Sequence, residues 1–583
     1  MADYTDEQRK VKELIAGDIA SVSKDRADLK KSIKDRRAMY DSALPNRQYF
    51  GRANVRVPFP WTWAQSMLPH YMTTVGGFKS VLDAYPRGGN NFEKALNVKR
   101  LLNFQLIYEM EFFPEALMFF TANVRDGLAF QKIKWDHERQ TGEFHLIDAN
   151  DFACDPRTGF LSNKTRWVAH IIGKTKEELL EGVQTLGYNP KVVEEIVAKS
   201  ASKTMSDGVT QLSEQRAVYN IWEWWGRADI GEDLDQEGNP VAGPDGQPVG
   251  GIRPVICHFY EDKLLSARTS VYGSVVPFVG LADVHDPFRL FKSKSELDPI
   301  KTLYEASSDI LNQRLDNVTM GINGFWTILK NSGLDVSRMV SSPWGVMFVN
   351  DHDDIRRWES QDVTQNAYQE IPALGELMKL SSGLQDVQRG TGVRGVGTAS
   401  GLELVDQNAS QRPDLKVTTA QHLYIRRVGE ILLQEDKMFM SEEKAIRDIG
   451  NPEAAAEMFS PDNLAGVWDI CPVPLTAQGE KAQRIGQLTN YLNVLNSIPM
   501  PTLRVQQRKE DIIEEVGSLL EVKHQVVSDG ELDDREAAAL QVSKNQLANT
   551  MKPPPPNGPA GPQATPGMAN NPGTAPVGAP GRR

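Results

Sequence analysis

The chain has 583 residues, of which 40% are apolar and 24% charged, and a formal net charge of −12. This composition is that of a folded protein with enough residues for several lobes. The negative charge argues against a protein that binds nucleic acid over its whole surface, because phosphate contacts require clustered lysine and arginine.

The three cysteines, Cys154, Cys257 and Cys471, lie far apart in the sequence and lack CxxC spacing. They predict neither a disulfide framework nor a structural zinc site, and they indicate a reducing compartment. The first residues lack the basic start and apolar core of a signal peptide. No apolar run approaches the ~20 residues that a membrane span needs. We therefore expect a soluble protein that is made in the cytoplasm and has no membrane partner.

The N-terminal part of the chain is predicted to be helical. Residues 3–44 are highly charged and carry a thin apolar stripe, which predicts a surface helix that completes its folding against a neighbour. The stripe consists of Val11, Leu14, Ile15, Ile19 and Val22. After a break at Pro45, an apolar helix is expected to include residues 67–72. The pattern from Phe92 to Phe120 predicts one strongly amphipathic helix.

Strand signals follow this helix. Residues 128–147 alternate as a β-hairpin, and a further strand is expected at residues 166–172. Residues 217–225 and 252–259 are candidates for a second strand pair. The connection over residues 229–251 is rich in glycine, proline and aspartate, which indicates an exposed loop or a long hairpin tip.

The stretch from Ser295 to Met440 has the most distinctive order of elements. A helix is followed by a strand-rich excursion, a second helix, a glycine-rich loop and a long third helix. The first helix ends near Ile322 and has one apolar and one polar face. The apolar face holds Tyr304, Leu311, Leu315, Val318 and Ile322, and the polar face holds Asp309, Asn312, Gln313, Asp316 and Asn317.

The second helical pattern, from Glu370 to Val387, runs into residues 389–401. Five glycines among residues 390–401 make this a loop of low conformational preference, suited to moving or to lying close against another molecule. A long helical pattern then extends from Leu402 to Met440, with an expected interruption at Arg412 and Pro413.

The remainder of the chain is predicted to end in a disordered tail. Residues 466–473 form a lone strand that must pair with an earlier one. Two helical patterns follow, at residues 477–496 and 505–522. Residues 553–583 begin with four prolines and cannot bury enough apolar surface to offset chain entropy.

The order of elements from Ser295 onward resembles that of the portal, or head–tail connector, proteins of tailed bacteriophages, with the short-tailed type as the nearest. In that family two stem helices surround a DNA channel, a small α/β clip lies between them, and a tunnel loop leaves the second stem helix. The run from Thr391 to Gly401, followed by residues 402–412, is similar to that family's passage from stem through loop into the long wing helix. The resemblance covers residues 55–520.

The resemblance implies an elongated, mainly helical α+β portal fold with wing, stem, clip and crown regions, in which two stem helices flank the small clip. The implied regions are an N-terminal charged helical segment (1–50), a wing of helices and hairpins (51–294), a first stem helix (295–323), a clip (324–364), a second stem helix (365–388), a tunnel loop (389–401), a long wing helix with a returning strand (402–475), crown helices (476–550) and a disordered Pro/Gly-rich tail (551–583).

The resemblance also implies a structural role in the virion. Subunits, usually twelve, form a ring at one capsid vertex, assembled in the host cytoplasm. The ring is a channel for genome packaging and ejection, and it docks the terminase motor and later the tail or adaptor proteins. Capsid and scaffold proteins are further implied partners, and double-stranded DNA passes through independently of its sequence. An acidic surface suits such a channel, although the same charge is ordinary for a soluble protein.

The implied site residues fall into two groups. The tunnel-loop residues that would meet DNA are Arg389, Gly390, Gly392, Val393, Arg394, Gly395, Val396 and Gly397. For the two arginines, a salt bridge to a neighbouring subunit is an equal alternative. The clip residues that would dock partners are Phe325, Trp326, Trp344, Phe348 and Trp358. The buried aromatic residues of a small domain core would give the same pattern.

Motifs for catalysis and cofactor binding are incomplete. The GxGxxG run from Gly390 to Gly395 follows a helix, whereas a dinucleotide-binding turn follows a strand. Gly173-Lys174-Thr175 lacks the earlier glycine of a phosphate loop. A calcium-loop start at Asp233 has Pro244 where a glutamate is needed.

The histidines show no metal-ligand spacing. We therefore expect no catalytic residues, no metal and no cofactor. Two alternatives to the portal interpretation remain: a cytoplasmic enzyme with an unrecognised active site, and a structural scaffold protein that binds no DNA.

Overall fold

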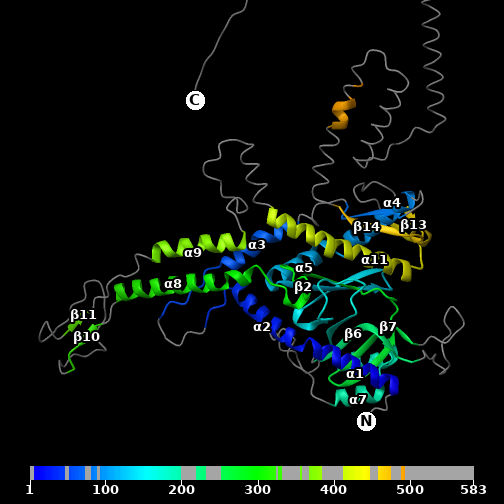
Figure 1. Cartoon of the computed structure of the whole chain (residues 1–583), viewed down its shortest axis with the longest axis horizontal. Helices are drawn as coiled ribbons and strands as arrows, with labels where there is room; N and C mark the ends of the chain where they lie inside the picture. The colour runs from blue at the N-terminus through cyan, green and yellow to red at the C-terminus, as the bar shows by residue number, and fades with distance from the viewer. Residues whose placement is uncertain are drawn as a thin grey trace, which may run out of the picture. The chain divides into compact units, whose positions relative to one another are not determined.

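The computed structural model describes residues 5–45, 52–72, 80–87, 92–198, 218–231, 251–323, 326–330, 355–357, 367–383, 411–446, 457–473, 487–492 and 495. The chain divides into two units, Met1–Gln478 and Gly479–Arg583. In the second unit, the described residues 487–492 are helical. Helix and strand are mixed, with more helix than strand, which confirms the predicted class of α+β, mainly helical. Figure 1 shows the order of the elements in the first unit.

The charged N-terminal segment forms two helices, α1 (Asp6–Ser21) and α2 (Ser23–Tyr40). Thr5 begins α1 with a capping box, in which its side chain accepts from the Gln8 N–H. Val11 and Ile15 are buried in a cluster with residues of a β-sheet of the same chain. The expectation that this stripe completes its folding against a neighbour is therefore wrong for its buried members, because the chain's own sheet covers them. Leu14 remains 43% exposed.

The helix predicted from Phe92 to Phe120 is divided in two. Helix α4 (Phe92–Phe104) continues as a π-helical turn (Gln105–Glu109), and α5 (Phe112–Asp126) begins after Glu111, which has a φ of +50°. Pro114 explains the break, because proline inside a continuous helix would clash with the carbonyl four residues earlier but is tolerated in a first turn. The prediction of a single helix was wrong because apolar periodicity continues across this break. Helix α3 (Phe59–Met72) packs against α5.

Two antiparallel sheets follow. The first has the order β3-β2-β9, and the second has the order β4-β5-β6-β7-β8. Their strands are β2 (Leu128–Asp136), β3 (Thr141–Ile147), β4 (Phe152–Cys154), β5 (Trp167–Lys174), β6 (Tyr219–Asp229), β7 (Ile252–Tyr260), β8 (Lys263–Thr269) and β9 (Phe278–Ala282). The hairpin predicted over residues 128–147 is confirmed, and so is the second strand pair, in which Trp224 lies opposite Cys257. Two short helices, α6 (Lys176–Thr185) and α7 (Pro190–Val197), lie between β5 and β6 in the chain.

The C-terminal part of the first unit returns to earlier elements. Residues 411–420 are helical, and they continue through a π-helical turn (Gln421–Ile425) into α11 (Arg426–Phe439). Arg412 and Pro413 are helical and lie at the start of this described stretch; the residues before Gln411, from which the predicted helix would continue, lie outside the described part of the chain. Strand β14 (Trp468–Pro472) pairs with β1 (Leu82–Pro86), which confirms that the strand at residues 466–473 pairs with an earlier one. Strands β12 (Lys444–Ile446) and β13 (Glu457–Phe459) form a further short pair.

The largest apolar cluster joins α3, α4, α5, β2 and the long helix that ends as α11. Tyr424 is at its centre: its ring stacks on Phe119 with centroids 4.0 Å apart, and its hydroxyl donates to Gln131 Oε1 at 2.8 Å. Because Tyr424 belongs to the π-helical turn, the turn presents an aromatic side chain to α5 and a hydroxyl to β2 at once. This cluster fixes the long helix to the rest of the first unit.

A buried polar row crosses the five-stranded sheet. His170, Glu223, His258 and Ser266 are direct neighbours on β5, β6, β7 and β8. Lys132 of the other sheet lies 2.5 Å from Glu223 Oε1. Burial alone would raise the pKa of Glu223, but Lys132 and the histidines hold it well below its usual range. Burial lowers the pKa of His258 to about 3. The row therefore holds one carboxylate against one ammonium and ties the two sheets together.

Candidate functional site

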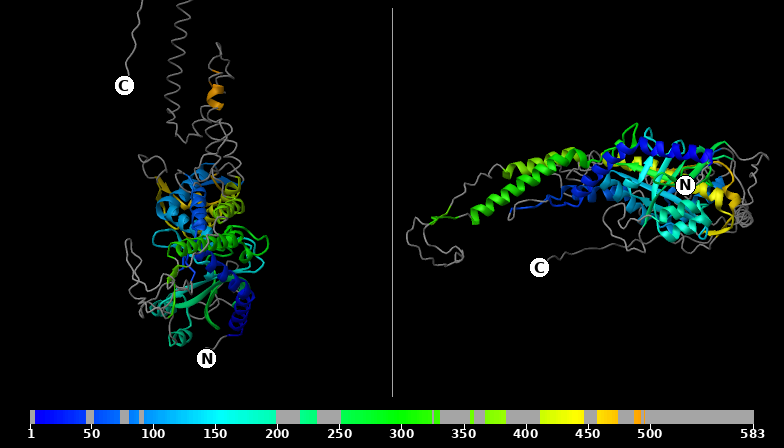
Figure 2. Two further views of the ribbon diagram at one scale, coloured as in Figure 1. Left: turned by 90° about the vertical axis from the view of Figure 1, so that its left-hand side faces the viewer. Right: turned by 90° about the horizontal axis from the view of Figure 1, so that it is seen from below.

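A pair of helices, α8 (Leu297–Asn323) and α9 (Ala367–Ser382), extends from the body of the first unit. With 27 residues, α8 is about 40 Å long. The two helices pack against each other and lie side by side in Figure 1 and in the right-hand view of Figure 2. Beyond α8, strand β10 (Trp326–Ile328) pairs antiparallel with β11 (Ile355–Arg357), and the chain then returns along α9. We call α8, β10, β11 and α9 the arm.

The polar face of α8 is covered by an extended segment of the same chain, residues 52–57. Asn312 is 1% exposed and pairs with both backbone groups of Val55: the Val55 N–H donates to Oδ1 at 2.7 Å, and Nδ2 donates to the Val55 carbonyl at 2.9 Å. The Ala53 N–H donates to Asp316 Oδ1 at 2.5 Å. The polar residues of this face therefore act as a template for a strand-like segment.

The apolar face of α8 is the more open one toward its outer end. Leu315, Val318 and Met320 are 37%, 43% and 49% exposed, and on α9 Leu377 and Leu380 are 50% and 78% exposed. Only Tyr304, near the body, is buried among the predicted apolar-face residues whose side chains the structure describes. The sequence pattern located the two faces of α8 correctly but could not show that the chain covers the polar one.

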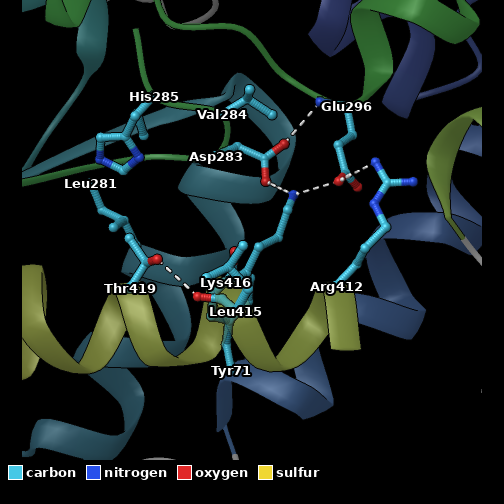
Figure 3. Close-up of a pocket in the computed structure, with 11 residues that line it drawn as sticks. Tyr71, Leu281, Asp283, Val284, His285, Glu296, Arg412, Leu415, Lys416 and Thr419 are labelled. Atoms are coloured by element: carbon cyan, nitrogen blue, oxygen red, sulfur yellow. Dashed lines mark hydrogen bonds and ion pairs between the residues drawn. The ribbon is translucent and has the colours of Figure 1, made fainter. Parts of the chain in front are cut away.

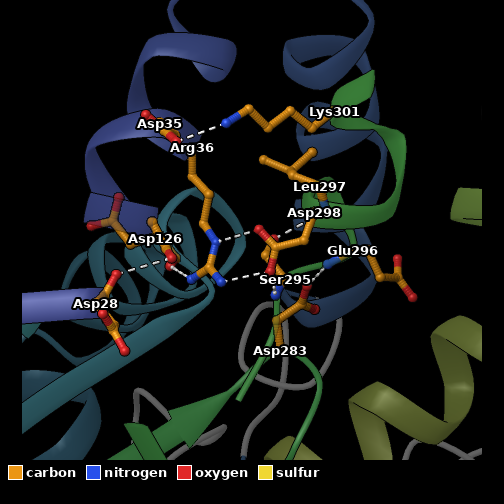
Figure 4. A network of polar contacts seen from close by, with 11 residues as sticks. Asp28, Asp35, Arg36, Asp126, Asp283, Ser295, Glu296, Leu297, Asp298 and Lys301 are labelled. Carbon is orange, nitrogen blue, oxygen red and sulfur yellow. Dashed lines mark hydrogen bonds and ion pairs between the residues drawn. The ribbon is translucent and has the colours of Figure 1, made fainter. Parts of the chain in front are cut away.

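The body end of α8 is held by a buried arginine. Arg36 of α2 is 3% exposed, and its Nε and Nη2 donate to the two carboxylate oxygens of Asp298 at 2.8 and 2.6 Å. Its Nη1 donates to the Asp126 carbonyl oxygen at 2.6 Å (Figure 4). Lys301 adds an ion pair to Asp35 at 2.7 Å. A bidentate arginine–carboxylate pair fixes orientation as well as distance, so these contacts set the direction in which α8 leaves the body.

Gly127 makes room for this arginine. Its φ is +80°, a left-handed conformation that favours glycine, and a Cβ there would lie 2.7 Å from Arg36 Nη1. Arg37, the next residue, donates to Asp126 Oδ2 and Asp148 Oδ2, both at 2.7 Å. Two adjacent arginines of α2 thus join α5, α8 and the loop after β3.

A second polar cluster lies where α8 meets the start of the long helix. Lys416 is paired with Asp283, and it lies 3.1 Å from Glu296 Oε1 (Figure 3). Arg412 lies 3.4 Å from the same glutamate oxygen, and the Glu296 N–H donates to Asp283 Oδ2 at 2.9 Å. Burial raises the pKa of Glu296. We call Asp283, Glu296, Arg412 and Lys416 the junction; they border a cavity of about 300 Å³.

The junction is also where the arm returns. Gly383 follows the last helical residue of α9 with a φ of +70°, and a Cβ there would lie 2.5 Å from Arg412 Nη1. The described chain stops at Gly383 and resumes at Gln411. Gly383 and Arg412 therefore lie side by side at the junction.

Most of the predicted site residues lie outside the described part of the chain. The tunnel-loop set, Arg389, Gly390, Gly392, Val393, Arg394, Gly395, Val396 and Gly397, belongs to residues 384–410, and the clip residues Phe325, Trp344, Phe348 and Trp358 are likewise outside it. Trp326 is described, in β10 opposite Arg357. The structure therefore leaves these site assignments as predictions.

The residues that position the arm were not found from the sequence. Arg36 and Asp298 are 262 positions apart, and Asp283 and Lys416 are 133 apart. Arg36 belongs to a helix with many charged residues, and its sequence pattern does not show which of them is paired with a distant carboxylate. The apolar stripe beside Arg36, with Leu29 and Ile33 buried on the same helix, shows only that this face packs against something.

Two further findings concern the described residues as a group. They contain no cluster of three or more His, Cys, Asp or Glu side chains placed to hold a metal ion. None of their helices is both long and apolar enough to cross a membrane.

Comparison with known proteins gives the family. The model of the phage SU10 portal protein family matches residues 142–516, which include the arm, the junction and the long helix. No curated protein matches the chain. The match covers more than half of the chain and contains the order of elements that resembles portal proteins. The chain therefore belongs to the phage SU10 portal protein family.

Proposed function

We propose that the protein assembles into a ring at one vertex of the phage capsid, with α8 and α9 as the stem around a central channel. The family match supports a portal role, a place in the virion and the passage of DNA. The observation that carries the stem assignment is the path of the chain, which runs out along α8, turns through β10 and β11, and returns along α9 to the junction. Twelve subunits are the number that the family resemblance implies.

The exposed surface of the arm supports ring formation. Leu315, Val318, Leu377 and Leu380 are each more than one third exposed, and apolar residues grouped on a projecting pair of helices mark an interaction site. A closed ring needs heterologous contacts, in which one face of a subunit meets a different face of the next. Neighbouring arms would cover these residues.

The loop between Gly383 and Gln411 is proposed to point into the channel. The support for this proposal is that Gly383 and Arg412, on either side of the loop, lie together at the junction. Arg389 and Arg394 would contact phosphates without regard to sequence, or would pair with a neighbouring subunit. The channel would serve genome packaging and later ejection.

The far end of the arm is proposed to dock partner proteins: the terminase motor during packaging, and the tail or adaptor proteins afterwards. The aromatic residues Phe325, Trp326, Trp344, Phe348 and Trp358 are proposed to provide anchors there. Capsid and scaffold proteins are further proposed partners. In this role the protein is structural and carries out no catalysis.

The test is the state of the purified protein. Size-exclusion chromatography with light scattering should give a mass of many subunits, and negative-stain images should show rings with a central hole wide enough for duplex DNA. A monomer or dimer over the micromolar range, with no rings in the images, would contradict the proposal.

A further inference from the structure

A second cavity, of about 280 Å³, lies at the end of the five-stranded sheet, bordered by the loop after β4 and the turn after β8. Its floor is apolar: Trp225, Val255 and Val275 are 5%, 1% and 8% exposed. None of the residues that form the junction lines it. The portal role as proposed above gives this cavity no function.

The rim of the cavity is cationic. Lys164, Arg166 and Arg227 line it, and no carboxylate is found among the lining residues that the structure describes. Arg166 lies 3.7 Å from Asp155. Lys164 and Arg227 are exposed and make no ion pair with a described residue. In a chain of net charge −12, three cations around one opening are a local reversal of sign. We call the cavity and its rim the cationic pocket.

The wall of the cationic pocket is braced from beneath. Arg427 of α11 is 7% exposed, and its Nη2 donates to Asn163 Oδ1 at 2.7 Å and to the Val276 carbonyl oxygen at 2.6 Å. The Val276 N–H donates to the same Asn163 oxygen at 3.1 Å. Both Asn163 and Val276 line the pocket. The loop and the turn are thus held together before any ligand arrives, which lowers the entropic cost of binding.

The shape and charge select the class of ligand. An apolar floor under a cationic rim suits an apolar side chain flanked by carboxylates. A phosphate group alone would leave the floor around Trp225 unfilled, and a DNA duplex is too wide to enter a cavity of about 280 Å³. The chemistry therefore favours an acidic peptide with an apolar anchor.

We propose that the cationic pocket binds an acidic peptide segment of a second copy of this chain. This inference rests on the proposed ring, because a ring places each copy's surface against the next. The chain contains a segment of the required chemistry: residues 232–237 are Glu-Asp-Leu-Asp-Gln-Glu. Residues 232–250 contain five acidic and no basic residues, so no cation of the segment itself would oppose the rim. This segment lies outside the described residues, and we choose it for its sequence, in which acidic residues flank Leu234.

The first experiment measures peptide binding. A fluorescent peptide of residues 229–239 should bind the full-length protein saturably, and binding should weaken with added salt. The double variant Lys164→Glu, Arg227→Glu should reduce the affinity at least tenfold, because two attractive pairs become repulsive. The control variant Lys30→Glu, Lys191→Glu makes the same charge change at two exposed positions on α2 and α7 and should bind as the wild type does.

A second peptide tests whether Leu234 is the apolar anchor. A peptide in which Leu234 is replaced by serine keeps every charge and should bind at least threefold more weakly, since it leaves the apolar floor unfilled. Equal binding by the pocket variant and the wild type, or by the serine peptide and the native one, overturns the proposal.

The second experiment asks whether the segment comes from another copy. In a Cys471→Ser background, the variant Ser274→Cys, Gln236→Cys keeps every charge of the pocket and of the segment. With an added thiol oxidant that accepts the two electrons, the two cysteines should form a disulfide that links chains into covalent oligomers on a non-reducing denaturing gel. A bond formed only within one chain would overturn the second-copy assignment. Negative-stain images of the wild type distinguish failure of this inference from failure of the proposed function. If rings form but the peptide does not bind, only this inference is rejected. If the peptide binds but no rings form, the proposed function is rejected together with the second-copy assignment.

Discussion

The body of the first unit and its arm use polar and apolar residues in opposite ways. In the body, charged groups such as Arg36 are buried and paired, and large apolar residues such as Tyr424 are covered. Along the outer part of the arm, the polar Asn312 is covered, whereas Leu315, Val318 and Leu380 are exposed. We expect such a body to be stable as a single chain, and we expect the exposed residues of such an arm to be covered by another surface. The following predictions test that difference.

Removing the arginine that holds α8 should have the largest effect on stability. Arg36→Ala leaves Asp298 and the buried carbonyl of Asp126 without their partner, and breaking a buried pair costs about 3–5 kcal/mol. Denaturant unfolding should show this loss of free energy. The exposed pair Arg87–Asp469 is the control, because Arg87→Ala should leave the midpoint nearly unchanged. Equal midpoints for the two variants would show that Arg36 does not anchor the arm.

Two buried acids of the body should make stability fall with rising pH. Burial raises the pKa of Glu435 to about 8 and that of Asp436 to about 7. Gln105 Nε2 donates to Asp436 Oδ1 at 2.7 Å. Since both folded-state pKa values exceed the unfolded ones, the stability they contribute is present at pH 4 and is lost as pH rises toward 8. Between its unfolded and folded pKa, each group lowers the free energy of unfolding by about 1.4 kcal/mol per pH unit, so Asp436 contributes up to about pH 7 and Glu435 up to about pH 8.

The variant Glu435→Gln, Asp436→Asn tests this by removing both titrations. Its free energy of unfolding should vary less between pH 5 and 8 than that of the wild type, as measured by urea titration at several pH values. The variant Glu442→Gln, Glu443→Gln, which changes two exposed acids just beyond the end of α11, is the control. A wild type whose stability rises over this range would refute the assignment.

Within the arm, the covered polar face should matter moderately for stability. Asn312→Ala leaves both backbone groups of Val55 without their partner, and each lost hydrogen bond of this kind costs about 1 kcal/mol. The adjacent Gln313 is exposed, so Gln313→Ala should change little. Hydrogen exchange of the Val55 amide should rise in the first variant and stay unchanged in the second. A slow Val55 amide in Asn312→Ala would show that the segment is held by other contacts.

The open apolar face should matter least for stability and most for assembly. Leu380→Asp replaces a side chain that is 78% exposed, so the free energy of unfolding should change by less than about 0.5 kcal/mol. Light scattering should nevertheless show loss of the ring, because a charge would then face the neighbouring arm. Leu180→Asp, on α6 at 48% exposure, should leave assembly intact. Rings formed by Leu380→Asp would place the subunit contact elsewhere.

The sequence predicted much of the fold but less of the site. The hairpin over residues 128–147, the pairing of β6 with β7 and the order of α8, β10, β11 and α9 follow from local periodicity and turn residues. Pro114 could have indicated the break between α4 and α5, but the apolar periodicity continues across it and suggested one helix. Arg36, Asp298 and the junction could not be found, since their partners are distant in the sequence.

The sequence alone determined the mixed, mainly helical class, the two faces of α8 and the resemblance that the family match bears out. These depend on properties that repeat every few residues. Only the tertiary structure decided that residues 52–57 cover the polar face of α8, that Gly383 meets Arg412, and that three cations surround one apolar cavity. Such features arise where segments that are distant in the sequence come into contact, and residue spacing along the chain does not show which segments will do so.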